Sequence, residues 1–122
     1  MIQEGTLVRD AAPCLYVYQQ QMGDHVQAGV VALCSVAEYD QGLIKKHEHT
    51  RKDKEDDRTR HMSETNANPE PLFLAYRAEA AIDAVVERVR ARPPAVDFVA
   101  ADGIGHTLYA QVNDLGLDDR CG

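Results

Sequence analysis

The sequence predicts an α+β protein in which a mainly antiparallel sheet has two helices packed on it. Two pairs of strand-like segments, each pair separated by a glycine-containing turn, predict two β-hairpins. Between these pairs the chain carries one polar segment and one amphipathic segment of helical character. A chain of 122 residues has the length of one domain, so we expect residues 1–122 to form a single α+β domain.

The first hairpin is predicted from residues 15–18 and 29–36, which are rich in β-branched and aromatic side chains. Gly23 and Asp24 lie in the turn between the two segments. The break at Gly42 ends this region, and we expect residues 43–46 to resume extended structure. The chain then enters a long polar segment.

A polar helix is predicted over residues 53–65. Thr50 precedes Asp53 by three positions, which is a weak form of the N-cap pattern. Pro69 and Pro71 end the segment because proline cannot continue a helix. The apolar residues 72–76 that follow predict a buried strand.

The amphipathic helix is predicted over residues 78–92. Its apolar positions recur three and four residues apart, at Ala81, Ile82, Val85, Val86 and Val89. The pair Pro93-Pro94 ends it, and residues 96–100 and 106–112 predict a second hairpin with its turn at residues 103–105. The expected order is therefore β-β-α-β-α-β-β, with helices covering one face of the sheet.

Composition excludes several functional classes. The net charge of −7 leaves no general basic field for nucleic acid phosphates. No apolar stretch approaches the ~20 residues that cross a bilayer, and the N-terminus lacks a signal-peptide pattern. Three cysteines without a Cys-x-x-Cys spacing predict neither a disulfide framework nor a zinc site. We therefore expect a cytoplasmic protein.

The segment 45–61 offers no residue that could anchor a hydrophobic core, and it combines His, Glu, Asp, Thr, Lys and Arg. We interpret it as a site for an anionic ligand, because Arg binds phosphate or carboxylate with two parallel hydrogen bonds and Lys supplies a point charge. The predicted ligand-binding residues are Lys46, Thr50, Arg51, Lys54 and Arg58. The predicted catalytic residues, which carry protons, are His47, Glu48, Asp57 and His61.

Two other interpretations stay open. His47, His49, Asp57 and His61 could bind a metal ion, although the His-Glu-x-x-His spacing is absent and we name no metal ligand. The segment could also be a solvated helix of alternating charge or a mobile loop. His106 follows Asp102-Gly103-Ile104-Gly105, which predicts a hairpin turn rather than a phosphate loop.

Much of the chain resembles the family called domain of unknown function 1015. The resemblance lies in residues 38–40, 44–48, 50–51, 53–58, 66–67 and 72–77, and in His61, Asp102, Gly103 and His106. Family members look considerably longer, and this chain looks like their middle portion. A later Asp-Gly-His-His-Arg segment in members is similar to one in ParB-like and ADP-dependent serine kinase-like proteins, and it is missing here.

That resemblance implies a nucleotide-linked or phosphoryl-transfer role for the whole family. The sequence does not identify a cofactor, and a nucleotide with Mg²⁺ is the candidate that such a role suggests. The first functional hypothesis is therefore a domain that binds a small phosphorylated ligand or nucleotide through segment 45–61. The alternative is a non-catalytic interaction module that docks on the rest of the protein or on a second subunit, as in a homo-oligomer. DNA binding by a partition-type protein is a third hypothesis, and the net charge opposes it.

Overall fold

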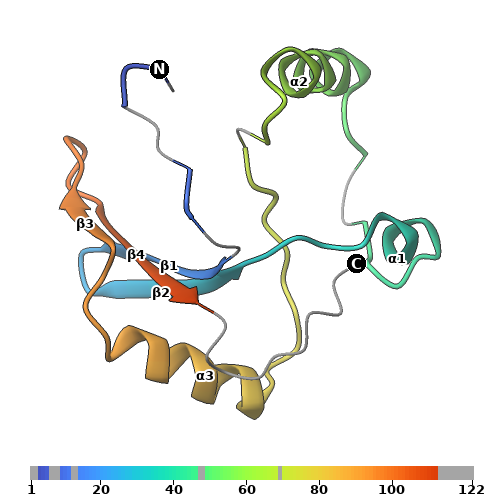
Figure 1. The fold of residues 1–122 in the computed structure, drawn as a ribbon. Coiled ribbons are helices and arrows are strands. Elements are labelled where there is room, and N and C mark those ends of the chain that lie inside the picture. Colours follow the sequence, from blue (N-terminus) through green and yellow to red (C-terminus); the bar gives the residue numbers. More distant parts are fainter. Residues whose placement is uncertain (1–2, 6–8, 12–13, 47–48, 69, 113–122) are drawn as a thin grey trace. The chain divides into compact units, whose positions relative to one another are not determined.

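The computed structural model describes residues 3–5, 9–11, 14–46, 49–68 and 70–112. The chain divides into two compact units (Figure 1). The sheet unit consists of Met1–Ala32 and Arg77–Gly122, and the helical unit consists of Leu33–Tyr76. The predicted α+β class is confirmed, and the single-domain interpretation stays a prediction.

The sheet has four strands, which are β1 (Cys14–Met22), β2 (His25–Val31), β3 (Val96–Val99) and β4 (Gly105–Val112). Their order is β2-β1-β4-β3, and every neighbouring pair is antiparallel. Both predicted hairpins are confirmed, and Gly23 in the first turn has φ 58°, a left-handed conformation that favours glycine. Pairing of β1 with β4 joins the two hairpins into one sheet.

Helix α3 (Ala80–Arg90) packs along one face of this sheet (Figure 1). The predicted helix 78–92 is thus confirmed with shorter ends. Glu79 is the N-cap, and its carboxylate accepts a hydrogen bond from the backbone N–H of Ala81 at 3.5 Å. The buried core consists of Val17 from β1 with Val86 and Val89 from α3, and Val85 and Tyr109 pack against it.

Successive side chains of a strand point to opposite faces of the sheet, and this alternation determines which of them face α3. Val17 is directly opposite Tyr109, so both lie on the core face of the sheet. Tyr18 is one residue from Val17 and His106 is three residues from Tyr109, so both lie on the other face, together with Phe98 of β3. The sheet therefore has one face packed by α3 and one that carries a row of aromatic side chains.

The helical unit contains α1 (Val36–Asp40) and α2 (Lys52–Thr65), and no described residue of either helix is buried. The predicted polar helix is confirmed as α2. Its N-cap is Arg51 rather than Thr50, and no side chain caps it. The helix ends at Asn66, which has φ 50° and is one of the residues that tolerate the left-handed conformation.

The prediction of a strand over residues 29–36 is wrong beyond Val31. Ser35 caps α1 instead, because its hydroxyl accepts a hydrogen bond from the backbone N–H of Glu38 at 3.4 Å. Ser35-Val36-Ala37-Glu38 has the spacing of a capping box, which competes locally with the apolar run before it. Residues 43–46 likewise form no strand.

The predicted buried strand over residues 72–76 is also wrong. These residues form neither helix nor strand, and their large apolar side chains are exposed. An apolar run becomes a strand only where another strand supplies hydrogen-bond partners, and the described part of the chain supplies none here. Within the described residues, no helix is long and apolar enough to span a membrane.

Candidate functional site on helix α2

In the structure, most of the charged segment forms the exposed helix α2, which has polar residues on every side. It carries four Lys and Arg side chains against five Asp and Glu side chains. Cations at positions 54 and 58 share one face with His61, because residues three and four apart are neighbours on a helix. The helix therefore presents mixed charge, without the excess of positive charge that an anion site favours.

Arg51 and Lys52 at the start of α2 are paired with carboxylates of the same helix. The guanidinium of Arg51 donates to both oxygens of Asp53, at 3.1 and 2.8 Å. Lys52 donates to Asp56 at 3.0 Å, a pair four residues apart. These contacts neutralise the positive charges of Arg51 and Lys52 at the start of the helix.

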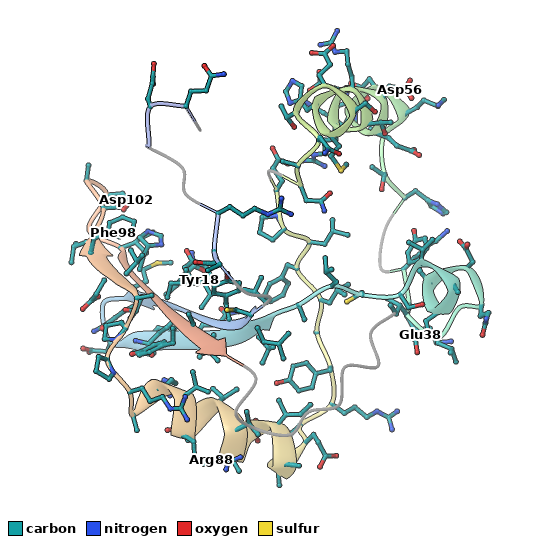
Figure 2. All side chains as sticks on the ribbon, in the orientation of Figure 1. Tyr18, Glu38, Asp56, Arg88, Phe98 and Asp102 are labelled. Carbon is teal, nitrogen blue, oxygen red and sulfur yellow. The ribbon has the colours of Figure 1, made fainter. Side chains whose placement is uncertain are left out.

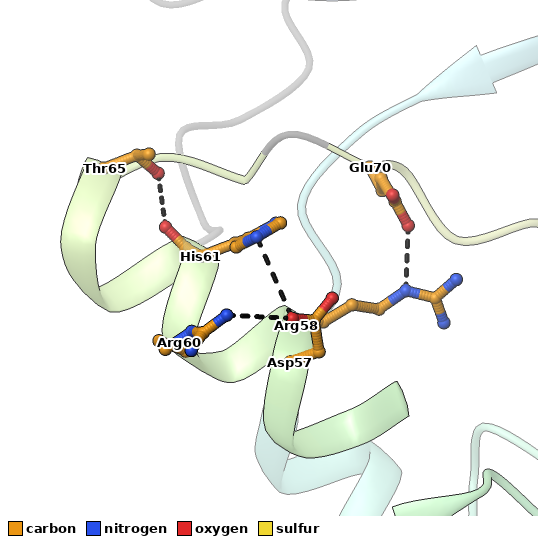
Figure 3. Close-up of polar contacts among 6 residues, drawn as sticks. All are labelled: Asp57, Arg58, Arg60, His61, Thr65 and Glu70. Carbon is orange, nitrogen blue, oxygen red and sulfur yellow. Dashed lines mark hydrogen bonds and ion pairs between the residues drawn. The ribbon is translucent and has the colours of Figure 1, made fainter. Parts of the chain in front are cut away.

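The second half of α2 holds a small polar cluster (Figure 3). The Asp57 carboxylate accepts a hydrogen bond from Arg60 at 3.3 Å and lies 3.9 Å from Nε2 of His61. Arg58 donates through Nε to Glu70 at 2.8 Å, which links the helix to the segment that follows it. Thr65 donates to the backbone carbonyl of His61 at 2.7 Å. Of the predicted site residues, the structure thus joins Asp57 and His61 directly.

The remaining predicted site residues are dispersed. Nζ of Lys46 lies over the ring of Tyr39, 4.7 Å from its centroid, in a cation–π contact. Thr50 is exposed and precedes the helix, and the side-chain ammonium of Lys54 has no partner among the described residues. His47 and Glu48 lie outside the described residues, so their predicted roles stay predictions.

No group of three or more His, Cys, Asp and Glu side chains within the described ranges could hold a metal ion. His49 and His61 therefore form no such group with Asp57 in that part of the chain. A hollow of about 320 Å³ does lie beside the C-terminal end of α2. Its lining residues are Met62, Ser63, Asn66, Ala67 and Asn68, and none of the predicted site residues is among them.

Sequence reasoning missed Glu70 as the partner of Arg58. Glu70 stands between Pro69 and Pro71, outside any helical spacing that would relate it to α2. It also missed the contact between Tyr18 and His106, which are 88 positions apart. No local pattern relates Tyr18 to His106, so only the pairing of β1 with β4 could reveal that contact.

The fold and the charged helix define a class, an α+β protein with a four-stranded antiparallel sheet and a polar helical unit. The chain belongs to the family described as "Protein of unknown function (DUF1015)", whose model matches residues 1–116. Neither the curated proteins nor the solved structures include a match to this chain. The family description assigns no activity to its members.

Proposed function

We propose that the helical unit is a non-catalytic docking module, which binds either the remainder of a longer protein or a second copy of the chain. The observation that carries this proposal is the exposed apolar run over residues 72–76. Leu72, Phe73 and Tyr76 have exposed fractions of 85, 75 and 59%. Contiguous apolar surface of this kind is typical of protein–protein contact sites.

The backbone of this run supports the same proposal. No backbone–backbone hydrogen bond joins residues 70–76 to another described residue. Figure 1 draws them as chain without helix or strand, after α2 in the sequence. Backbone groups that lack backbone partners among the described residues, combined with large apolar side chains, suit an added strand at the edge of a partner's sheet.

Helix α2 fits such a module because packing within its own unit contributes little to its stability, since none of its residues is buried. A helix that is polar all round is stabilised by ion pairs between its side chains or by a polar partner. The pairs of Arg51, Lys52 and Arg60 with carboxylates of α2 supply the first contribution. Exposed pairs of this type contribute roughly 0.2–1 kcal/mol each, so a docked partner would add substantially to the stability of the unit.

The expected loss of docking affinity on substitution follows from the burial of these side chains in the complex. Full burial of one Leu or Phe side chain stabilises by about 1.5–3 kcal/mol, and 1.4 kcal/mol changes a binding constant about tenfold. Replacement of both Leu72 and Phe73 by Ser should therefore weaken docking by roughly a hundredfold or more.

The test is sedimentation of the full chain over a range of concentrations, alone and with the remainder of the longer protein. We expect the native chain to associate in one of these mixtures, and the double variant Leu72→Ser, Phe73→Ser to lose that association. Met22→Ser removes an exposed apolar side chain of the sheet unit and is the matched control. A native chain that stays monomeric and binds nothing in either mixture contradicts the proposal.

A second candidate, favoured by a separate observation, is binding of a small phosphorylated ligand or nucleotide at α2. The Lys54 ammonium has no partner among the described residues and shares a helix face with Arg58 and His61. In this proposal Lys46, Thr50 and Arg51 complete the anion contacts. His47, Glu48, Asp57 and His61 would transfer protons or bind Mg²⁺.

The resemblance to longer proteins with a ParB-like or serine kinase-like segment supports this candidate, with this chain as their middle portion. It is tested by thermal shift with phosphate, ADP and ATP, each with and without Mg²⁺. Arg58→Ala should abolish any ligand-induced shift and barely change the melting temperature of the free chain, because the pair with Glu70 is exposed. Arg60→Ala, on another side of α2, is the control. Equal loss in both variants, or no shift with any compound, contradicts it.

A further inference from the structure

The sheet face opposite α3 carries three rings from three different strands. Tyr18 lies on β1, His106 on β4 and Phe98 on β3, and His106 is directly opposite Phe98 in the pairing of β3 with β4. Figure 2 shows Tyr18 and Phe98 on the side of the sheet away from α3. The rings therefore take no part in the core of Val17, Val86 and Val89.

The three rings are nearly parallel. The planes of Tyr18 and His106 differ by 14° with centroids 6.1 Å apart, and those of Phe98 and His106 differ by 19° at 5.1 Å. The values for Phe98 and His106 lie in the range of offset stacking between aromatic rings, whereas Tyr18 lies nearly edge to edge with His106, as the short distance between its hydroxyl and Nδ1 requires. A further planar ring could continue this arrangement at low cost, because the protein rings are already aligned.

A hydrogen bond with Tyr18 orients the imidazole of His106, the middle of the three rings. The Tyr18 hydroxyl lies 2.6 Å from Nδ1 of His106. If the neutral imidazole accepts the tyrosine proton at Nδ1, it carries its own hydrogen on Nε2. His106 is then a hydrogen-bond donor set among aromatic side chains.

A shallow cavity of about 180 Å³ opens at these rings. It is lined by Tyr18, Val96, Phe98, His106, Thr107 and Leu108. Phe98 is 52% exposed, so its ring is available to a ligand. The lining contains no Lys, Arg, Asp or Glu side chain, and Asp97 next to it accepts a hydrogen bond from Thr107 at 3.1 Å. The surface thus fits an uncharged group better than an anion.

We propose that this aromatic row is a binding site for a small, uncharged, planar heteroaromatic ring. Phe98 supplies the stacking surface, Val96 and Leu108 supply apolar contact, and the imidazole of His106 binds a hydrogen-bond acceptor on the ring. The site belongs to the sheet unit and does not depend on the docking proposed for the helical unit.

The test is an NMR titration of the full chain with nicotinamide, adenine and indole, with cyclohexanol as a non-planar probe. The amides of Phe98 and His106 should shift with the planar probes and not with cyclohexanol. Nicotinamide and adenine, which carry acceptors, should bind more tightly than indole.

Phe98→Ala should weaken binding roughly tenfold, which is the order of the effect that stacking on one aromatic side chain has. Phe98→Leu keeps a large apolar side chain in β3, so it should leave the strand intact. It should still weaken binding of the planar probes by a similar factor, because leucine offers no ring for stacking. Val99→Ala removes an exposed side chain from the other face of β3 and should bind as the native chain does. Absence of shifts at millimolar probe, equal shifts with cyclohexanol, or native affinity in Phe98→Leu would overturn the proposal and leave the rings as cross-strand stabilisers of the sheet.

Discussion

Truncation of Val89 tests whether α3 and the sheet share the core described above. Val89 is 1% exposed and lies in the cluster with Val17 and Val86. Val89→Ala removes two methyl groups, each worth about 0.8 kcal/mol when buried, and the remaining cavity adds to the loss. The higher helix propensity of alanine stabilises the folded state by about 0.5 kcal/mol. We therefore expect a net decrease of about 2 kcal/mol in the free energy of unfolding.

Urea denaturation followed by circular dichroism measures this change in the free energy of unfolding. Val36→Ala is the matched control, because it makes the same substitution in a helix at a side chain that is 73% exposed. It should change stability by less than about 0.5 kcal/mol. A loss at Val89 as small as the loss at Val36 would refute the core that joins α3 to the sheet.

Two further predictions concern single contacts. The Tyr16 hydroxyl donates to the Asp10 carboxylate, and this hydrogen bond, with smaller contributions from burial and the charge of Asp10, raises the Tyr16 pKa to about 12. Asp10→Asn should lower that pKa toward 10.0, measured by phenolate absorbance, while Asp97→Asn should leave it unchanged. Because the folded pKa lies above the unfolded value, the contribution of Tyr16 to stability is present below pH 10 and is lost as the pH rises through about 12. At the end of α2, Asn66→Gly should preserve or raise the helix content seen by circular dichroism, whereas Asn66→Ala should lower stability by about 1 kcal/mol, because Asn66 has φ 50°. Equal effects of the two substitutions at residue 66 would refute this explanation of the helix end.

Local patterns in the sequence predicted the elements that depend on local physics. Gly23 and Gly103 lie in the turns of the two hairpins. The spacing of Val85, Val86 and Val89 predicts the face of α3 that becomes buried. Helix α1 was missed because the apolar run before Ser35 suggested a continuous strand and hid the capping pattern.

Features that depend on distant partners could not be predicted in this way. Residues 72–76 have strand composition, yet strand structure requires a neighbouring strand that the described chain does not supply. The predicted anion site assumed that cations would be free, whereas Arg51 and Arg58 form ion pairs with carboxylates. The partner of Arg58 lies twelve positions away, beyond the reach of helical spacing.

The measurement that tests the docking proposal most directly is amide hydrogen exchange of residues 72–76. It compares the dilute chain with the chain at high concentration and with the chain mixed with the remainder of the proposed longer protein. We predict exchange near the unprotected rate in the dilute chain, because these residues lack backbone–backbone hydrogen bonds to the described residues. In an associated state exchange should slow by roughly tenfold or more, as for hydrogen-bonded strands. Fast exchange under all three conditions, or strong protection already in the dilute monomer, would contradict the account.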